Sequence, residues 1–237
     1  MKGLLQRNRL KINKELNSYD SRKYFTPSCY ANSFVTVSAL SAHLHGKCID
    51  IGCGDMPFRT LIEKHVSQYD SVDIEKRSPD VTYLADIQDM HIIDSDSYDS
   101  ALCLEVLEHV PNPFHAISEI HRILKKDASL VCSVPHLSRL HEEPHDYYRY
   151  TKHGIKYLFE TSGFHVVSIQ PAGGIFCFLG HQLSTMFLLP VWHIPILKNL
   201  VWGINKWLIV KPCYACDKLF DKNKIFASGY TCVVRKQ

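Results

Sequence analysis

Residues 47–62 read KCIDIGCGDMPFRTLI, and this stretch decides the fold. Its first five residues are mostly small or apolar, which is typical of a short buried strand. Gly52 and Gly54 then allow a tight turn close to a ligand, because glycine tolerates positive φ and has no Cβ. Asp55 suits a helix N-cap, and Pro57 suits the first helical turn. The stretch therefore predicts a strand, a glycine turn and a helix, the unit with which α/β proteins bind nucleotides.

The chemistry around the turn narrows the choice of ligand. A dinucleotide-binding turn reads G-x-G-x-x-G, but Asp55, Met56 and Pro57 follow Gly54, so the third glycine is missing. The chain also lacks Gly-Lys-Ser/Thr, which excludes a P-loop. Asp50 stands just before the turn, and a carboxylate there fits a cationic ligand better than a phosphate. The alternative for this stretch alone is a glycine turn that binds nothing.

Length and composition favour one globular α/β domain with an appendage. The chain has 237 residues and a formal net charge of +3, with no block of Lys or Arg that indicates nucleic-acid binding. Residues 1–18 contain no apolar segment typical of a signal peptide, so the nine Cys are expected to be reduced thiols in a cytoplasmic protein. Cys213 and Cys216 have C-x-x-C spacing without a second pair, and no metal site is predicted.

A second acidic residue lies at the distance that a βαβ unit requires. Residues 69–74 read YDSVDI and form the next predicted strand, with Asp73 following Gly54 by 19 residues. At this spacing an acidic residue stands at the tip of the second strand and can accept hydrogen bonds from ribose hydroxyls. Glu75 takes this role if the register slips. The alternative is a solvated loop carboxylate.

Strands and helices alternate over residues 28–135, which predicts a parallel sheet with helices on both faces. Further strands are expected at 81–84, 98–104 and 129–135. A helix beginning at Pro113 is expected to close with the cations of residues 125–127. Strands at 165–169 and 230–235, joined antiparallel, complete the expected sheet.

Four segments together resemble class I S-adenosylmethionine-dependent methyltransferases. They are Asp50-x-Gly52-x-Gly54, then Asp73, then Asp86-Ile87, and LCLEVLEHVPNP from Leu102 to Pro113. The last segment is similar to one in the type 11 small-molecule methyltransferases. The resemblance implies a three-layer Rossmann-like fold with a mostly parallel seven-stranded sheet in the order 3-2-1-4-5-7-6. It also implies an enzyme that transfers methyl groups, with S-adenosylmethionine as cofactor.

The resemblance also assigns cofactor contacts. Asp50 would anchor the ammonium group, Asp73 the ribose diol, and Asp86 the adenine amino group, with Ile87 beside it. The other implied cofactor contacts lie in the same segments: Gly52, Cys53, Gly54, Ile74, Leu104 and Glu105.

Polar side chains crowd the segment after the fifth strand, residues 136–150. In an open parallel sheet this segment lies over the pocket, at the carboxyl ends of the strands. Histidine can remove a hydroxyl proton near neutral pH, and Tyr and Arg can hydrogen-bond a polar acceptor. The candidate catalytic residues are His136, His145, Asp146 and His109. The candidate substrate-binding residues are Tyr147, Tyr148, Arg149 and Tyr150. The alternative is that these side chains only pack the loop, and proximity alone can supply much of the rate.

The string PHDYYRYT resembles a signature of bacterial methyltransferases found with surface-polysaccharide biosynthesis. This implies O-methylation of a sugar, a lipid-linked glycan or another small acceptor. Other acceptors that stay open are a quinone, a lipid or RNA. Two further classes compete: a nicotinamide-dependent oxidoreductase, and a binding module without catalysis. The acceptor, the methylated atom and the oligomeric state do not follow from the sequence.

We expect a single methyltransferase domain over 1–237, made of four parts. They are an N-terminal helical arm at 1–45 that lies over the site, a cofactor-binding core at 46–170, an apolar helical insert at 171–227 and a final strand at 228–237. The insert lacks an uninterrupted apolar run that could span a membrane. Its three Trp and flanking Lys fit a membrane interface, so peripheral contact with the inner membrane face through 171–210 is one hypothesis. A homodimer surface and a lid over the acceptor are the others.

Overall fold

The computed structural model describes residues 3–237, which form two compact units. Unit 1 contains the described residues up to Phe34 together with Pro171–Ser228. Unit 2 contains Val35–Gln170 and Gly229–Gln237. The division falls within helix α3 and within strand β6.

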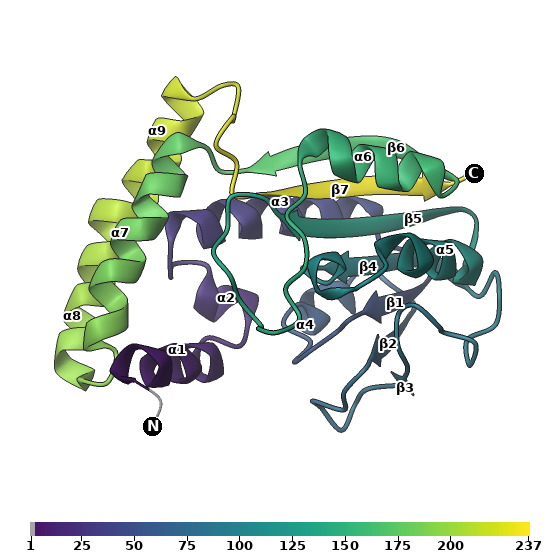
Figure 1. The fold of residues 1–237 in the computed structure, drawn as a ribbon, viewed down its shortest axis with the longest axis horizontal. Coiled ribbons are helices and arrows are strands. Elements are labelled where there is room, and N and C mark those ends of the chain that lie inside the picture. Colours follow the sequence, from purple (N-terminus) through teal and green to yellow (C-terminus); the bar gives the residue numbers. More distant parts are fainter. Residues whose placement is uncertain (1–2) are drawn as a thin grey trace. The chain divides into compact units, whose positions relative to one another are not determined.

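Figure 1 shows how the elements follow one another along the chain. The helices are α1 (Leu4–Glu15), α2 (Tyr19–Arg22), α3 (Pro27–His43), α4 (Arg59–Ile62), η1 (Leu107–His109), α5 (Pro113–Ile123), α6 (Lys152–Thr161), α7 (Ile175–Val191), α8 (Pro195–Ile204), the π-helix η2 (Asn205–Val210) and α9 (Lys211–Phe220). The strands are β1 (Lys47–Ile51), β2 (Gln68–Asp73), β3 (Tyr83–Leu84), β4 (Tyr98–Leu104), β5 (Leu124–Pro135), β6 (Phe164–Ala172) and β7 (Gly229–Lys236).

Unit 2 is built on a seven-stranded sheet in the order β3-β2-β1-β4-β5-β7-β6. Strands β1 to β5 pair in parallel, and β7 is antiparallel to β5. Figure 1 shows the arrows of β6 and β7 pointing in opposite directions. The predicted three-layer fold and strand order are confirmed.

The pairing register brings the ends of the central strands to one edge of the sheet. Ile51 at the end of β1 lies opposite Val72 on one side and Cys103 on the other. Leu104 at the end of β4 lies opposite Ser133 of β5. Because parallel strands end at the same edge, the residues that follow them become neighbours in space.

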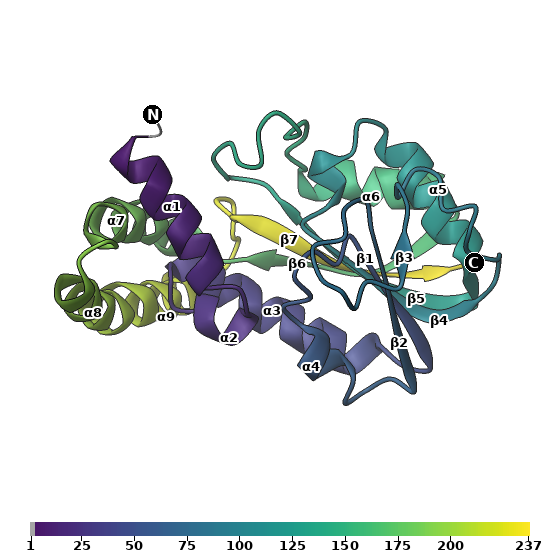
Figure 2. The ribbon, with the colours of Figure 1, turned by 90° about the horizontal axis from the view of Figure 1, so that it is seen from below.

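Helices cover both faces of the sheet in unit 2. Figure 2 shows α5 and α6 on one face, with α4 and the second half of α3 on the other. The face toward α3 and α4 buries a cluster of apolar residues: Leu40, Leu44, Cys48, Ile62, Leu102, Val131 and Val233. Strands covered on both faces need runs of apolar residues, which is why the sequence showed them so clearly.

Two predicted helix boundaries are wrong. Helix α4 begins only at Arg59, and Asp55 does not cap it, because the N-cap is Phe58, which makes no side-chain capping bond. The helix is therefore four residues long, and its N-terminus does not open at the glycine turn. The helix from Pro113 ends at Ile123, and the cations at 125–127 lie in β5. Leu124 pairs with Tyr98 of β4, so sheet pairing replaces the expected last helical turn.

Unit 1 is helical and has its own core. The core residues Ile12, Leu16, Phe25, Leu188 and Trp192 come from α1, from the segment before α3, and from α7 with the residue that follows it. Asn205 of η2 also donates from its side chain to the backbone carbonyls of Tyr24 and Phe25, at 3.0 and 3.1 Å. No helix within residues 3–237 is long and apolar enough to cross a bilayer.

A buried carboxylate holds the start of α7. Asp217 of α9 is 1% exposed and accepts hydrogen bonds from the backbone N–H groups of Gly174, Phe176 and Cys177, at 2.6 to 3.1 Å. The first N–H groups of a helix have no partner within the helix, and the N-cap Gly174 has no side chain that could accept from them. A residue distant in sequence therefore takes the role that a local cap usually fills, and it joins α7 to α9.

We expect Asp217→Ala to lower the free energy of unfolding by about 3 kcal/mol, because three buried N–H groups lose their acceptor. All three Trp residues lie in the insert, so tryptophan fluorescence during urea unfolding reports on unit 1. Lys222→Ala, at an exposed site in the following turn, is the control and should shift stability by less than about 0.5 kcal/mol. Equal effects of the two variants would show that the carboxylate does not stabilise α7.

Candidate functional site

The glycine turn after β1 has one crowded side and one open side. The backbone N–H groups of Gly52 and Cys53 both donate to the carbonyl of Val72, at 2.8 and 3.3 Å. Gly52 has φ +68°, and a Cβ there would lie 2.4 Å from the Val106 side chain. Gly54 has φ +52°, and no described atom outside its immediate chain neighbours lies within 4 Å of a Cβ built on it. The first glycine is thus required by packing, while the second leaves its backbone open to a ligand.

The Asp73 carboxylate ties the end of β2 to this turn. One oxygen accepts from the backbone N–H of Gly54 at 2.8 Å, and the other accepts from the N–H of Glu75 at 3.0 Å. Asp73 is only 8% exposed. Each carboxylate oxygen can accept a further hydrogen bond, so the group can still bind a pair of hydroxyls.

Asp50 lies buried behind the turn. Its carboxylate accepts a hydrogen bond of 2.7 Å from the hydroxyl of Tyr69. Burial is the main cause that raises the pKa of Asp50 to about 7, and the nearby Asp73 charge adds to it. The hydrogen bond from Tyr69 lowers the pKa, but by less than burial raises it. The ionised form of Asp50 is therefore unfavourable in the protein alone, and a cationic group on a ligand would stabilise it.

Asp86 stands after β3, held by a residue that the sequence did not single out. The Gln88 backbone N–H donates to Asp86 at 2.8 Å, and its side-chain amide donates to both carboxylate oxygens at 3.2 Å. The Gln88 side-chain oxygen accepts from the backbone N–H of Asn112 at 3.0 Å. Ile87 is half-buried beside them, and Ile74 is exposed after β2.

Glu105 follows β4 in a strained conformation. Its φ is +55°, a left-handed value that costs a non-glycine residue energy and that is often found at functional sites. The backbone N–H donates to the Ser133 carbonyl, and the Ser133 hydroxyl donates to the Glu105 carboxylate at 2.8 Å. Part of the Glu105 side chain is accessible to solvent, but the protein around the carboxylate limits its contact with water. This desolvation, together with repulsion from Glu108, raises the pKa of Glu105 to about 7. Leu104 lies half-buried beside it.

Arg149 fastens the segment 136–150. Its guanidinium donates to both oxygens of Asp146, at 2.6 and 2.8 Å, and to the backbone carbonyls of Ser138, Arg139 and Tyr148. Arg149 and the backbone N–H of His141 hold the pKa of Asp146 well below its usual range, despite partial burial. The Arg149–Asp146 pair therefore shapes the segment.

The three tyrosines of the segment have different surroundings. Tyr150 is buried, and its hydroxyl donates to the Leu107 carbonyl at 3.0 Å. Tyr148 is exposed and donates to the Pro111 carbonyl at 2.9 Å. Tyr147 is also exposed, and its hydroxyl lies 3.1 Å from Nδ1 of His145. Tyr147 and Tyr148 thus present accessible rings.

The histidines near the site have different surroundings. His136 packs its ring 5.5 Å from the ring of Tyr230, and His145 is exposed. His109 lies in η1, and its Nδ1 bonds the backbone carbonyl of His145. Its other ring nitrogen lies 3.5 Å from Glu108, which is fully buried. His141 approaches the same carboxylate oxygen at 3.7 Å, and this proximity is the largest cause of a raised His141 pKa.

Five residues around the site were not among the predicted site residues: Tyr69, Gln88, Glu108, Ser133 and His141. The adjacent pair Glu108-His109 was visible in LEHV, but a buried glutamate cannot be told from a solvated one without its tertiary partners. The other four act through partners distant in sequence, or through a loop conformation that the pattern does not encode.

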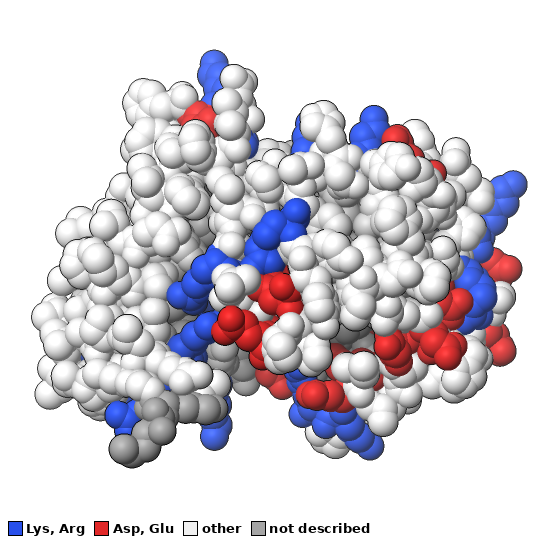
Figure 3. Space-filling model, in the orientation of Figure 1, with Lys and Arg blue, Asp and Glu red and all other residues white. Residues whose placement is uncertain are grey.

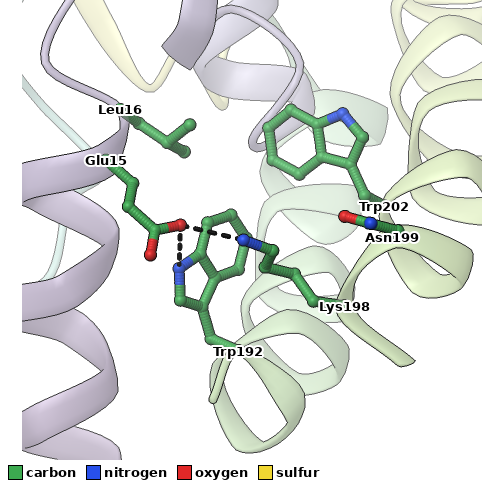
Figure 4. Close-up of a pocket in the computed structure, with 6 residues that line it drawn as sticks. All are labelled: Glu15, Leu16, Trp192, Lys198, Asn199 and Trp202. Atoms are coloured by element: carbon green, nitrogen blue, oxygen red, sulfur yellow. Dashed lines mark hydrogen bonds and ion pairs between the residues drawn. The ribbon is translucent and has the colours of Figure 1, made fainter. Parts of the chain in front are cut away.

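A pocket of about 280 Å³ lies within unit 1 (Figure 4). Its lining residues are Glu15, Leu16, Trp192, Lys198, Asn199 and Trp202. Glu15 accepts hydrogen bonds from the Trp192 indole N–H and from Lys198, at 3.1 and 3.0 Å. These polar groups satisfy one another, so the pocket itself gives no indication of a ligand.

The comparison with protein families decides the assignment. A family described as a methyltransferase domain matches residues 25–169, more than half of the chain. The chain belongs to the methyltransferase-domain family. The match contains the glycine turn, the acidic residues after the strands and the segment 136–150. The prediction of a class I methyltransferase that uses S-adenosylmethionine is thereby confirmed at the level of family and fold. No curated protein matches the sequence.

Solved structures with the same fold are distant in sequence. A methyltransferase from Archaeoglobus fulgidus, described as dependent on S-adenosylmethionine, is 15% identical, with a TM-score of 0.58 over 96% of this chain and 99% of its own. A Burkholderia thailandensis N1-methyltransferase with bound 1,6-didemethyltoxoflavin and S-adenosylhomocysteine is 12% identical, with a TM-score of 0.54 over 86% and 77%. The [4+2]-cyclase SpnF is 15% identical, with a TM-score of 0.60 over 86% and 80%. Since a cyclase shares the fold, the fold alone does not decide the reaction.

The raised pKa of Asp50 predicts a pH dependence of cofactor-product binding. An ammonium group binds the ionised carboxylate, which is the minor form below about pH 7 and the major form above it. We expect the affinity for S-adenosylhomocysteine to rise about tenfold from about pH 6 to about pH 8, measured by calorimetry. Asp50→Asn should bind more weakly and with a flatter profile; because Glu105 titrates in the same range, this variant isolates the Asp50 contribution. A flat profile for the native protein would contradict the role.

Proposed function

We propose that this methyltransferase transfers a methyl group from S-adenosylmethionine to a hydroxyl oxygen of a sugar, a lipid-linked glycan or a similar small polar acceptor. One observation carries the cofactor side: Asp50, Asp73, Asp86 and Glu105 stand within or directly after four neighbouring strands that end at one edge of one sheet. The acceptor side rests on segment 136–150, which follows the next strand at that edge.

The residues of the cofactor side have distinct tasks in this proposal. S-adenosylmethionine supplies an activated methyl group on a positively charged sulfur. Asp50 provides the negative charge that attracts the amino group, and Asp73 positions the ribose while it fixes the glycine turn. Asp86, held by Gln88, accepts from the adenine amino group. In-line transfer from a sulfonium needs alignment more than acid–base chemistry, so positioning by these groups supplies much of the rate.

The acceptor side fits a polyhydroxylated ligand. Exposed aromatic rings at Tyr147 and Tyr148 can stack on a sugar face, and their hydroxyls add hydrogen-bonding groups. His136 and His145 are the candidate bases for the hydroxyl proton, because a neutral imidazole can accept a proton. Asp146 and Arg149 act by positioning, since each is engaged with the other. The likeness of PHDYYRYT to methyltransferases found with surface-polysaccharide biosynthesis supports the same acceptor class.

We further propose that unit 1 contacts an anionic membrane surface. Residues 1–34 and 171–228 contain thirteen Lys or Arg and four Asp or Glu, a formal charge of +9. The remaining residues contain fourteen Lys or Arg and twenty Asp or Glu, a formal charge of −6. The small net charge of the whole chain therefore hides a strongly basic unit, which anionic lipid headgroups would attract.

Apolar side chains are exposed on the same unit. Over the part of the face occupied by α7 to α9, Figure 3 shows few charged side chains. The exposed large apolar residues of the insert are Leu179, Leu183, Met186, Phe187, Ile194, Ile196, Leu197, Leu200, Ile204, Trp207, Leu208, Leu219, Phe220, Ile225 and Phe226. The ammonium group of Lys211 lies 3.5 Å from the ring centre of Trp207. Exposed apolar side chains, tryptophan and lysine on helices together favour an interfacial location, which would bring the enzyme to a lipid-linked acceptor.

Calorimetry with S-adenosylhomocysteine and NAD tests the cofactor half of the proposal. We expect the sulfur ligand to bind and NAD not to bind. Asp73→Ala should weaken binding roughly 30-fold or more, because charged hydrogen bonds to the ribose are worth about 2 kcal/mol or more. Glu75→Ala, two positions further on and exposed, is the matched control and should leave the affinity nearly unchanged.

Two outcomes would contradict this assignment. Binding of NAD without binding of the sulfur ligand would refute the methyltransferase function. Loss of affinity in Glu75→Ala but not in Asp73→Ala would move the ribose contact to Glu75. Methyl transfer from a radiolabelled donor to nucleotide sugars, lipid-linked glycans, quinones and RNA then identifies the acceptor class.

Vesicle flotation tests the membrane half. We expect the protein to float with vesicles that contain phosphatidylglycerol, less so with phosphatidylcholine alone, and less so at high salt. Trp207→Glu should reduce the bound fraction several-fold, since it places a charge at the interface. The matched control is Tyr157→Glu on α6, whose residue is 63% exposed against 59% for Trp207. If the protein does not float but sediments as a dimer that Trp207→Glu dissociates, the apolar face is a homodimer surface instead.

A further inference from the structure

The Glu108 carboxylate in unit 2 is buried without a hydrogen bond from any described residue to satisfy it. It is 0% exposed, and neither of its carboxylate oxygens has a hydrogen-bond partner within the described residues 3–237. A buried carboxylate without hydrogen bonds or a counter-ion costs several kcal/mol. A cation bound beside this carboxylate would compensate its charge.

Two imidazole rings face the same carboxylate. Nε2 of His109 lies 3.5 Å from Oε1 of Glu108, and Nε2 of His141 lies 3.7 Å from the same atom. Both distances are too long for hydrogen bonds, for which N···O is about 2.7–3.2 Å. They are close to the separation of about 3.3 Å that two ligand atoms have around a tetrahedral zinc ion. One ligand atom from each of the three residues lies within 4.8 Å of the other two.

The remaining ring nitrogens are arranged as in metal-binding histidines. Nδ1 of His109 bonds the backbone carbonyl of His145, and Nδ1 of His141 lies 3.2 Å from the backbone carbonyl of Arg139. With the proton on Nδ1, each ring keeps a free lone pair on the Nε2 that faces Glu108. A ligating histidine usually donates its other N–H to a carbonyl or carboxylate in this way.

Two charged groups lie near Nδ1 of His141. A carboxylate oxygen of Asp146 lies 3.6 Å from its Nδ1. Arg149 also approaches this nitrogen, at 3.3 Å, but the same guanidinium nitrogen has better acceptors in Arg139 and Asp146, at 2.7 and 2.8 Å. The His141 Nδ1 is therefore not needed as an acceptor and can carry the proton.

We propose that Glu108, His109 and His141 form a binding site for a divalent transition-metal ion of the zinc type. Two imidazole nitrogens and one carboxylate oxygen are a ligand set that Zn²⁺ prefers, whereas Mg²⁺ and Ca²⁺ prefer oxygen ligands alone. Three protein ligands leave a further coordination position for water or a ligand oxygen. The site connects η1 to the segment 136–150, so the ion would also fasten that segment.

A role in catalysis rests on the proposed function. Glu108 and His109 follow β4, and His141 belongs to the segment 136–150 that the proposed function places on the acceptor side. The ion would therefore lie on the acceptor side of the site. A hydroxyl bound to the ion would lose its proton more easily, and His145 or a water molecule would accept that proton. The oxygen would then form a bond to the methyl carbon as the methyl–sulfur bond breaks, leaving S-adenosylhomocysteine. In this arrangement His109 binds the ion and is not a free base.

Metal binding by the full-length, chelator-treated protein tests the site without any assay of activity. We expect about one equivalent of Zn²⁺ by calorimetry, with Mg²⁺ and Ca²⁺ as weak competitors. Co²⁺ should give the intense visible absorption of a site with fewer than six ligands. Glu108→Gln and His141→Gln should each weaken Zn²⁺ binding more than about 100-fold. His153→Gln, an exposed histidine on α6, is the matched control and should bind normally.

Thermal denaturation without metal separates the proposal from a structural ion pair. If the ion compensates Glu108, then Glu108→Gln in chelator should melt at or above the native temperature, because the variant removes an uncompensated charge. Added Zn²⁺ should raise the melting temperature of the native protein but not of the variant. Equal Zn²⁺ affinity for the native protein and Glu108→Gln, or strong destabilisation of that variant in chelator, would overturn the proposal. A protein that binds Zn²⁺ but not S-adenosylhomocysteine would keep the site and refute only the proposed function.

Discussion

The contact on which the site depends is the pair of hydrogen bonds from the Asp73 carboxylate to the backbone of Gly54 and Glu75. It joins the end of β2 to the turn after β1, the two segments that a nucleoside must meet together. Since the carboxylate is almost buried, these bonds are shielded from competing water. In the proposed function, the Asp73 carboxylate would bind the ribose, and it also fixes the turn that would lie beneath the methionine moiety. One side chain therefore serves both the folded structure and ligand recognition.

Charge is distributed unequally between the two units. Unit 2 is acidic, and two carboxylates at its strand ends, the buried Asp50 and the accessible Glu105, have pKa values raised to about 7. Such groups are destabilising in the empty protein and become favourable when a cation arrives. Unit 1 has the opposite sign and contains most of the exposed large apolar residues of the described chain. The net charge of the whole chain conceals this difference between the units. The acidic unit contains the candidate site, and the basic unit contains the surface proposed for a partner.

The sequence allowed prediction of those features that depend on local geometry. The glycine turn and the position of Asp73 follow from apolar runs and from the length of a βαβ unit, and the strand order was implied by the resemblance to methyltransferases. The structure has all three as predicted. Helix boundaries were less predictable: α4 is a single turn, and the charged residues 125–127 lie in β5, because sheet pairing with β4 outweighs the helical pattern.

The composition of segment 136–150 was informative, but the individual surroundings of its residues were not. Whether a tyrosine there is buried, like Tyr150, or exposed, like Tyr147, depends on tertiary contacts. The same holds for Glu108 and His141, which lie far apart in the chain and meet only in the folded protein. Pairings of this kind have no sequence period, so a single sequence does not show them.

The internal bonding of Arg149 has a consequence for recognition. Its guanidinium holds three backbone carbonyls and one carboxylate of its own segment, so the loop is already ordered before any acceptor arrives. Ordering a flexible loop on binding costs conformational entropy, and a loop that is fixed beforehand avoids this cost. A rigid loop also adapts poorly to a ligand of different shape. The enzyme should therefore gain affinity for acceptors that match the loop and lose tolerance for those that do not.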